Sequence, residues 1–290
     1  MIPSILLVVA LVSAAGPASK VTTPDGVEIA YEERGTSKPG TATLVLIHGW
    51  CCDRTQFASQ LESMSKSRRV VALDLPGHGE SGHNREKWTI KGYGADVKAV
   101  CEKLALERVI LAGHSMGGPV SLEAARLMPG RVIGVVGIDT LQNAEFDFPK
   151  EMMGRMVAAF EGDFEGTIRG WIPGMLPPGT DPAIGEGIVK RAMGCDKKSV
   201  IAVFSDFANL DMKAMYSDAK VPIRCVNAAP STPNSMPTAV ETNRKYCDFD
   251  AAIMEGVGHY PMLEKPAAFD EKLAWAIGEI EKKAAAAQKQ

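Results

Sequence analysis

Residues 109–118 read VILAGHSMGG, and the rest of the chain can be interpreted outward from them. A short run of β-branched and apolar residues, typical of a buried strand, leads into Gly113, Ser115 and Gly117, and a helical pattern begins near Pro119. The spacing Gly-x-Ser-x-Gly between a strand and a helix is that of a nucleophile elbow, a sharp turn that needs glycine because its backbone crowds itself. The sequence therefore predicts that Ser115 is a nucleophile held at the carboxyl end of a strand.

Similar apolar runs recur on both sides of this stretch and alternate with amphipathic segments of helical period. Because these strands are apolar throughout rather than at every second residue, we expect helices to bury both faces of the sheet. The pattern predicts an α/β fold with an open, mainly parallel central sheet and helices on both faces. The predicted strands span residues 43–47, 70–73, 109–111, 132–138, 222–226 and 251–254, and the clearest helices span residues 93–106 and 120–127.

The alternation is interrupted between residues 144 and 216, a segment that contains seven of the 14 Met and six of the nine Phe. This composition and the Pro-rich turn at 173–178 predict a helical cap inserted after the strand at 132–138. The cap is too small to bury all of its Met and Phe against itself, so part of this surface should face the ligand-binding edge of the sheet. The predicted core then consists of residues 19–143 and 217–290.

Residues 1–18 carry no charged side chain, since Lys20 is the first in the chain. Their apolar run, from Ile5 to Ala15, has the length of a signal-peptide core and is followed by small residues. The run is shorter than the roughly 20 apolar residues that span a bilayer. We therefore expect residues 1–18 to be a cleaved signal peptide and the protein to be secreted or periplasmic, with no stable membrane span. An uncleaved leader that anchors the protein to a membrane is the alternative.

The charge balance argues against a polyanionic partner. The 290 residues include 32 Lys and Arg against 35 Asp and Glu, which gives a formal net charge of −3. A chain of this balance has no broad basic surface for phosphates, so we expect no nucleic-acid partner. The sequence sets no oligomeric state.

The six cysteines show no spacing typical of a structural zinc site, so we expect no metal. In an oxidising compartment they could form disulfides, in pairings that the sequence does not determine. The alternative is that some of them are free and buried, as cysteines often are.

Three more motifs accompany the elbow in order along the chain. They are His48-Gly49-Trp50 after the strand at 43–47, DLPGHGES at residues 74–81, and Gly256-Val257-Gly258-His259 near the end. With these motifs the chain after the leader resembles the α/β-hydrolase family, in its serine hydrolase or esterase-like branch. The resemblance implies a triad of Ser, acid and His, a backbone oxyanion hole, and no organic cofactor.

The chain order of such hydrolases, nucleophile then acid then histidine, points to the base. Of the five histidines only His259 follows Ser115, in a glycine-rich loop after the last predicted strand. We expect its neutral imidazole to take the serine proton and to return a proton to the leaving group. His48 is interpreted as a support of its own loop, His78 and His83 as parts of the loop after Asp74, and His114, inside the elbow, as a substrate-binding residue.

The acid is harder to assign. The family's usual position follows the seventh strand of its sheet, but residues 227–237 contain no Asp or Glu. The other position used in the family follows the sixth strand, where Asp139 stands, and there it would hold His259 in the correct tautomer. Asp248, Asp250 and a bare Ser/His dyad are the alternatives, and a purely structural Asp139 would cap the following turn.

The resemblance implies that the oxyanion hole consists of the backbone N–H groups of Met116, after the nucleophile, and of Trp50. The Trp50 ring is a candidate substrate-binding group that either walls the acyl pocket or packs against the cap. Asp53 and Arg54 are expected to form a loop ion pair. The turn at 74–81 is expected to be architectural, because its glycines supply backbone freedom.

These expectations combine into one function. The sequence predicts an exported serine hydrolase that cleaves a carboxylic ester or a related small, apolar acyl compound through an acyl-enzyme. A lactonase, a carbon-carbon bond hydrolase or a cofactor-free perhydrolase would use the same triad, and a non-catalytic ligand receptor would need no triad at all. The natural substrate, its chain length and its stereochemistry stay open at this point.

Overall fold

A computed structural model describes residues 18–288, and one sheet of eight strands runs through this part of the chain. The strands are β1 (Ser19–Thr22), β2 (Glu28–Arg34), β3 (Thr43–Ile47), β4 (Val70–Leu73), β5 (Val109–His114), β6 (Val132–Ile138), β7 (Ile223–Ala228) and β8 (Phe249–Met254). Their order across the sheet is β1-β2-β4-β3-β5-β6-β7-β8. Strand β2 runs in the opposite direction to all the others. The predicted α/β fold with a mainly parallel sheet is confirmed.

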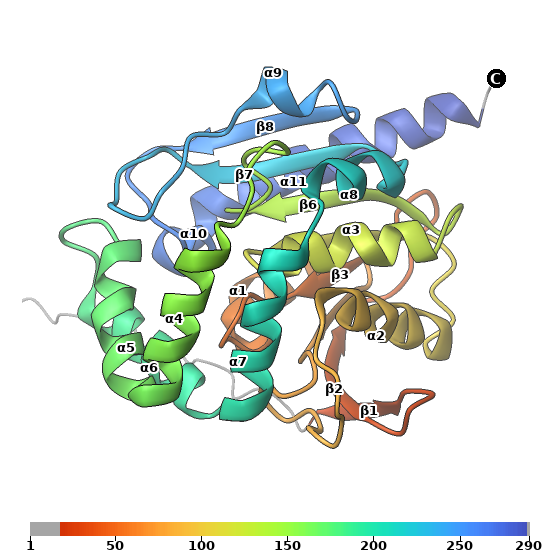
Figure 1. Cartoon of the computed structure of the whole chain (residues 1–290). Coiled ribbons are helices and arrows are strands. Elements are labelled where there is room, and N and C mark those ends of the chain that lie inside the picture. The colour runs from red at the N-terminus through yellow and green to blue at the C-terminus, as the bar shows by residue number, and fades with distance from the viewer. Residues whose placement is uncertain (1–17, 289–290) are drawn as a thin grey trace, which may run out of the picture.

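Helices cover both faces of this sheet (Figure 1). They include α1 (Ala58–Ser65), which follows the short η1 (Arg54–Phe57), then α2 (Ile90–Lys103), α3 (Gly117–Leu127), α8 (Met212–Ala219), α9 (Val240–Asn243), α10 (Pro261–Glu264) and α11 (Pro266–Ala287). Strand β5 shows why the strands are apolar throughout. Ile110 and Ala112 pack in the cluster that contains α1 and α11, whereas Val109 and Leu111 pack in the cluster that contains α2 and α3. Both faces are therefore buried, as the sequence pattern indicates.

The two strands at the N-terminal edge are absent from the predicted strands. In β2 the buried Ile29 and Ala30 stand between polar residues, so its pattern is weaker than that of a strand buried on both faces. The turn between β1 and β2 contains Pro24, Asp25 and Gly26, and Gly26 has a φ of +84°. This turn chemistry is a hairpin signal that the strand prediction did not use.

Between β6 and β7 the chain forms a group of helices that we call the inserted helices. They are α4 (Lys150–Gly162), α5 (Phe164–Trp171), η2 (Ile172–Met175), α6 (Pro182–Met193), α7 (Lys197–Asp206) and η3 (Phe207–Asn209). In Figure 1 they form a group beside the carboxyl ends of the strands. The next helix, α8, packs against α3, so the layer that covers the sheet resumes at Met212, inside the range predicted for the cap.

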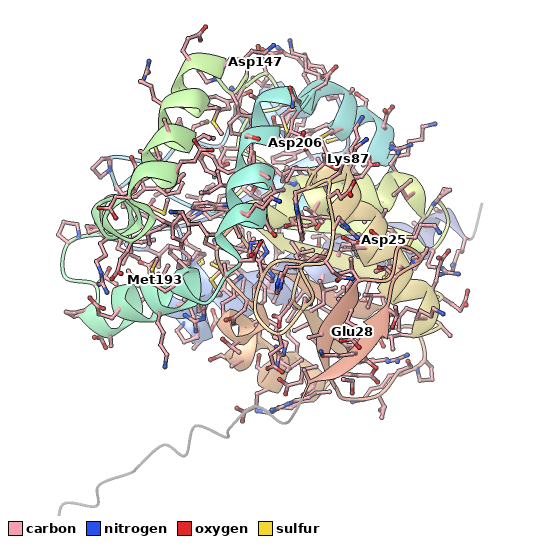
Figure 2. All side chains as sticks on the ribbon, turned by 60° about the horizontal axis from the view of Figure 1, so that its bottom comes forward. Asp25, Glu28, Lys87, Asp147, Met193 and Asp206 are labelled. Atoms are coloured by element: carbon pink, nitrogen blue, oxygen red, sulfur yellow. The ribbon has the colours of Figure 1, made fainter. Side chains whose placement is uncertain are left out.

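The inserted helices are bonded to the core at several points. Asp206, at the end of α7, accepts a hydrogen bond of 2.9 Å from the N–H of Ile90 at the start of α2. Figure 2 labels Asp206. The N–H of Asp196 donates one of 2.9 Å to the carbonyl O of Gly77, in the turn after β4. Met193 at the end of α6 is exposed on the opposite side of this group.

None of the helices within residues 18–288 is long and apolar enough to cross a membrane. The predicted signal peptide falls almost entirely on residues 1–17, outside the described part of the chain. Strand β1 begins at Ser19, directly after the predicted leader.

All six cysteines are free thiols in the structure, so the alternative of free cysteines describes them. Burial raises the pKa of the Cys101 thiol to about 12 and that of the half-buried Cys247 to about 12. Burial also raises the pKa values of the other three buried thiols, Cys51, Cys52 and Cys225. These cysteines are therefore packing residues of low reactivity.

Candidate active site

The elbow between β5 and α3 explains each glycine of the Gly-x-Ser-x-Gly pattern. A Cβ at Gly113 would lie 2.0 Å from the carbonyl O of Gly117, and a Cβ at Gly117 would lie 2.4 Å from the carbonyl O of Ile47. Ser115 itself has a φ of +50°, in the left-handed region that side chains rarely adopt. The strained turn leaves the Ser115 side chain half-buried at the end of β5.

The loop after β3 lies directly against this elbow. A Cβ at Gly49 would lie 2.6 Å from Nδ1 of His114 and 3.1 Å from Cβ of Ser115, so only glycine fits there. His48 is buried, its Nδ1 bonds the carbonyl O of Gly49 at 2.7 Å, and its Nε2 accepts the N–H of Leu75 at 2.8 Å. Burial lowers the pKa of His48, which suits this neutral supporting role. The prediction that His48 supports its own loop is confirmed.

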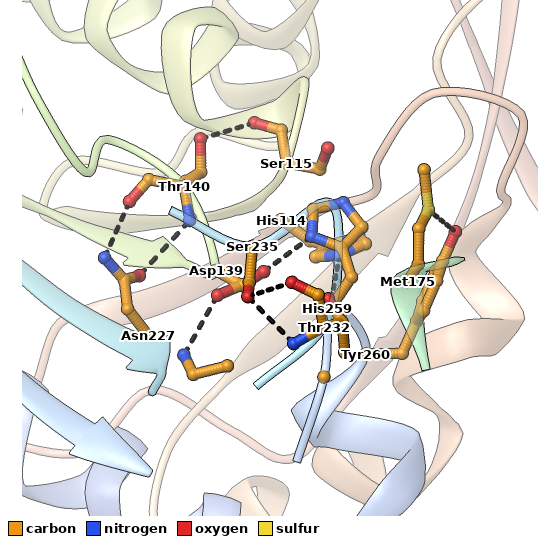
Figure 3. Close-up of polar contacts among 12 residues, drawn as sticks. His114, Ser115, Asp139, Thr140, Met175, Asn227, Thr232, Ser235, His259 and Tyr260 are labelled. Carbon is orange, nitrogen blue, oxygen red and sulfur yellow. Dashed lines mark hydrogen bonds and ion pairs between the residues drawn. The ribbon is translucent and has the colours of Figure 1, made fainter. Parts of the chain in front are cut away.

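His259 and Asp139 are in direct polar contact. Nδ1 of His259 lies 2.6 Å from Oδ2 of Asp139, and Figure 3 shows both beside Ser115 and His114. The other carboxylate oxygen of Asp139 accepts the N–H of Ala228 at 2.9 Å. Asp139 directly follows β6 and has a φ of +42°, so the chain holds it in a second strained turn next to the elbow.

The alternative acids bond elsewhere. Asp248 lies at the start of β8 and pairs with Arg224 at 3.1 Å and with Lys283. Asp250 pairs with Arg244 at 3.3 Å. Both are at the amino end of β8, whereas the histidine loop follows its carboxyl end. Among the proposed acids, only Asp139 is brought to His259 by the described fold.

Backbone N–H groups of the loop that carries His259 donate hydrogen bonds to Glu264 and to Met175. The carboxylate of Glu264 accepts the N–H groups of Gly258 at 2.8 Å and of Tyr260 at 3.0 Å. The N–H of His259 donates to the carbonyl O of Met175 in η2 at 2.9 Å. Burial raises the pKa of Glu264. Sequence reasoning missed Glu264 and Met175, because neither belongs to a motif.

Thr140 and Asn227 hold the elbow from the side of β6 and β7. The hydroxyl of Thr140 donates to the carbonyl O of Ser115 at 2.8 Å. The amide of Asn227 accepts the N–H of Thr140 at 3.2 Å and donates to its carbonyl O at 3.1 Å (Figure 3). A polar residue at the end of a fully buried strand was the available signal for Asn227.

His114 is enclosed by protein. Its side chain is 1% exposed, its Nε2 lies 2.8 Å from the carbonyl O of His259, and its Nδ1 lies 3.4 Å from the amide nitrogen of Gln56. Burial, assisted by the nearby His259, lowers its pKa well below the usual 6.5. With both ring nitrogens directed at protein groups, His114 is placed to support the site, whereas the sequence analysis expected it to contact substrate.

The ring of Trp50 and its backbone N–H group have different surroundings. Its indole N–H donates to the carbonyl O of Val200 at 2.7 Å, and its ring lies 4.8 Å from the rings of Phe160 and Phe204 and 5.7 Å from Trp171. The ring therefore packs against the inserted helices. Within residues 18–288, the backbone N–H groups of Trp50 and of Met116 have no protein acceptor. These two amides have the free donors that an oxyanion hole requires.

The expected pair of Asp53 with Arg54 is wrong. Arg54 is 4% exposed and pairs instead with Asp74 and, at 2.6 Å, with Glu80. Asp53 accepts the N–H of Thr55 at 2.8 Å and so caps η1. A buried guanidinium needs carboxylates, and the fully buried Asp74 of the DLPGHGES turn supplies one. This contact supports the architectural interpretation of that turn.

No group of His, Cys, Asp and Glu side chains in the described part of the chain is arranged to hold a metal ion. The bonded pair of His259 and Asp139 lies beside the elbow that carries Ser115, and the free N–H groups of Met116 and Trp50 belong to this elbow and to the loop packed against it. Such an arrangement can perform nucleophilic acyl transfer.

Known proteins resemble this chain over different extents. The sequence profile of the alpha/beta hydrolase fold matches residues 42–174. The dihydrolipoyllysine-residue acetyltransferase component of the acetoin cleaving system of Pseudomonas putida is 39% identical over 119 residues, which are 41% of this chain and 32% of that protein. A non-heme haloperoxidase of Rhodococcus erythropolis is 33% identical over 144 residues, 49% of this chain and 51% of that protein. The matches thus span about half or less of these curated relatives.

Solved structures resemble almost the whole chain. A thermophilic esterase from Thermogutta terrifontis has a TM-score of 0.78 and 25% identity, over 92% of this chain and 100% of that one. An esterase from Exiguobacterium antarcticum has a TM-score of 0.80 over 90% of this chain and 99% of that one, and at 17% identity it shows the fold alone. The profile match covers β3 to β6 with the elbow, and the structural likeness covers almost the whole chain, so the protein has the fold of the α/β-hydrolase family.

Proposed function

We propose that the protein is an exported serine hydrolase that cleaves a small apolar carboxylic ester through an acyl-enzyme. The observation that carries this proposal is the 2.6 Å contact between His259 and Asp139 beside the elbow that holds Ser115. Structural likeness to the thermophilic esterase from Thermogutta terrifontis, at 25% identity, supports the same reaction class. A receptor without catalysis would not need a histidine oriented by a carboxylate next to a strained serine.

The reaction follows from the roles of three side chains. Ser115 Oγ attacks the ester carbonyl carbon while Nε2 of His259 takes its proton, and Asp139 stabilises the imidazolium that results. The N–H groups of Trp50 and Met116 stabilise the oxyanion of the tetrahedral intermediate. When this intermediate collapses, the alcohol leaves with the proton from His259. Water, activated by His259, then attacks the acyl-enzyme and releases the acid and free Ser115.

The inserted helices supply the cap of this site in our proposal. Their aromatic side chains gather around Trp50, next to the amide that we assign to the oxyanion hole. An apolar environment on this side favours an apolar acyl group over a charged one. We expect small esters to be better substrates than charged esters of equal size.

A perhydrolase reaction is the second candidate. The relatives at 33% and 38% identity include a non-heme haloperoxidase of Rhodococcus erythropolis and a non-heme chloroperoxidase of Streptomyces lividans. In this reaction hydrogen peroxide replaces water in the attack on the acyl-enzyme, and a peroxyacid leaves. The same triad serves both reactions, so adding peroxide to the ester assay separates them. A structural neighbour that is an enol-lactonase adds lactones to the substrates worth testing.

Hydrolysis of short p-nitrophenyl esters tests the proposed function. Wild type should turn over, Ser115→Ala should lose this activity, and Ser205→Ala should match wild type because Ser205 is an exposed residue of α7. Hydrolysis by Ser115→Ala at the wild-type rate would overturn the proposal.

Export is a separate part of the proposal, supported by the apolar segment of residues 5–15. Protein recovered from the exported fraction of a suitable host should begin between Ala15 and Lys20 when its N-terminus is determined by mass spectrometry. An intact Met1 in soluble exported protein would contradict cleavage.

A further inference from the structure

The peptide group of His259 is held from both sides by residues outside its own loop. Its N–H donates a hydrogen bond of 2.9 Å to the carbonyl O of Met175, which lies in the inserted helices. Its carbonyl O lies 2.8 Å from Nε2 of His114, the residue before the elbow serine. The hydrogen bonds that Glu264 accepts shape the loop locally. The bonds of the His259 peptide group to Met175 and His114 fix the position of the loop relative to the inserted helices and to the elbow.

The bond from His114 requires one particular protonation state. A carbonyl oxygen only accepts, so Nε2 of His114 must carry the proton and Nδ1 is left as an acceptor. Nδ1 faces the amide nitrogen of Gln56 at 3.4 Å, which is the donor that this tautomer needs. The neutral ring is also compatible with its neighbour, because the ring centroids of His114 and His259 are 4.8 Å apart and His259 becomes charged during turnover.

The bond to Met175 is possible because residue 258 is glycine. A Cβ at Gly258 would lie 2.2 Å from the carbonyl O of Met175 and 2.8 Å from Cδ of Pro177. Backbone atoms at 2.2 Å cannot give way as a flexible side chain can. Any side chain at position 258 would therefore push the end of η2 away from the histidine loop.

We propose that His114 and the Met175 carbonyl together form a clamp that sets the position of His259 between the elbow and the inserted helices. His114 and Gly258 are then positioning residues, which act on the reaction through His259. This inference rests on the proposed function, because it takes His259 as the base. Loss of either side of the clamp should lower kcat because the base is misplaced. On the His114 side substrate binding should change little, because this enclosed ring does not line the proposed cap.

Substitution of His114 tests one side. His114→Phe keeps a planar ring but has no donor for the His259 carbonyl, and we expect kcat to fall by roughly 10- to 100-fold with KM within about 3-fold. His114→Gln places an amide N–H close to where Nε2 stands and should restore most of the lost kcat. His83→Gln, at an exposed histidine, is the matched control and should behave as wild type.

Substitution of Gly258 tests the other side without touching His114. Gly258→Ala should lower kcat by a comparable factor, and kcat is the readout here because the displaced η2 belongs to the proposed cap. The control is Gly154→Ala in α4, where an added Cβ meets nothing within 4 Å. Because both substitutions disturb one unit, the double variant His114→Phe/Gly258→Ala should lose less than the product of the two single losses.

Thermal unfolding of each variant is measured alongside the kinetics, so that a loss of folded protein is not counted as a loss of kcat. Full kcat in folded His114→Phe, or equal kcat in His114→Phe and His114→Gln, would overturn the His114 half of the clamp. Full kcat in folded Gly258→Ala would overturn the Met175 half. If Ser115→Ala keeps hydrolytic activity, the proposed function itself fails, which is a different result from either of these.

Discussion

Nδ1 of His259 and Oδ2 of Asp139 lie 2.6 Å apart although 120 residues separate them in the chain. The contact arises because β6 and β8 flank β7 in the parallel sheet, so the loops after both strands open at the same edge. The elbow after β5 opens there too. The topology of the sheet thus brings together a serine, a carboxylate and a histidine from three separate parts of the sequence.

The choice of acid can be tested by isosteric substitution. Asp139→Asn should lower kcat for ester hydrolysis by about 10⁴-fold, because the amide cannot stabilise the imidazolium and favours the wrong tautomer. The fold should survive, since Asn keeps an oxygen for the N–H of Ala228. Asp248→Asn and Asp250→Asn are the matched controls, and a large loss in either of them with a small loss in Asp139→Asn would reverse the assignment.

The pair between Arg54 and Asp74 should be a large single contribution to stability. Both side chains are buried, so Asp74→Ala leaves the Arg54 guanidinium with only the exposed Glu80 as its partner and should lower the free energy of unfolding by about 3 kcal/mol. The exposed pair of Lys98 and Glu102 is the control, and Glu102→Ala should cost about 0.5 kcal/mol or less. Equal losses of unfolding free energy in the two variants, measured by denaturant unfolding, would show that the buried pair stabilises the fold no more than the exposed pair does.

Three buried histidines should make the protein sensitive to acid. Burial lowers the pKa of His48, of His114 and, to about 3, of His78, all below the usual 6.5 of the unfolded chain. Below pH 6.5 the unfolded state takes up these protons and the folded state does not, so stability is complete above that pH and falls as pH drops toward the folded pKa values. His78, whose pKa in the folded protein is lowered to about 3, should contribute about 1.4 kcal/mol per pH unit in this window.

The histidine term is checked with His78→Asn, which keeps a donor for the carbonyl O of Pro76. The slope of the unfolding free energy against pH, measured between about pH 4 and 6, should decrease by the amount that corresponds to about one proton taken up on unfolding. His83→Asn, at an exposed position, is the control for removing a histidine. An unchanged slope in His78→Asn would mean that His78 takes up its proton in the folded state.

The free thiols give a prediction about redox conditions. With no disulfide among the described residues, a thiol reagent should titrate six cysteines in unfolded protein that was never reduced. The temperature of unfolding should be the same with and without dithiothreitol. Fewer than six thiols before reduction, together with a lower unfolding temperature after it, would show that a disulfide forms.

The sequence was most informative where structure is local. The elbow could be predicted because its glycines, its serine and the strand before it are adjacent in the chain, and the crowding at Gly113 and Gly117 is a property of the turn itself. The parallel sheet followed from strands such as β5 that are apolar at every residue. The edge strands β1 and β2 lack that pattern, because only some of their residues are buried.

Contacts between distant segments could not be predicted in the same way. Asp53 was an available partner for Arg54 in sequence, but burial of the guanidinium made the fully buried Asp74 the better one. Met175 bonds the histidine loop through a backbone carbonyl, which any residue carries, so no residue type could have marked it. His114 looked like a pocket residue because of its place in the elbow, and only the fold shows that its ring is enclosed.

The most direct test of the central claim is to find where a fluorophosphonate probe bonds to the protein. The probe forms a covalent adduct with an activated serine, and mass spectrometry of the digested protein identifies the modified residue. We predict one adduct, on Ser115, that forms in wild type and is strongly slowed in Asp139→Asn. An adduct on another residue, or ester hydrolysis that continues after Ser115 has been modified, would contradict the assignment of this site.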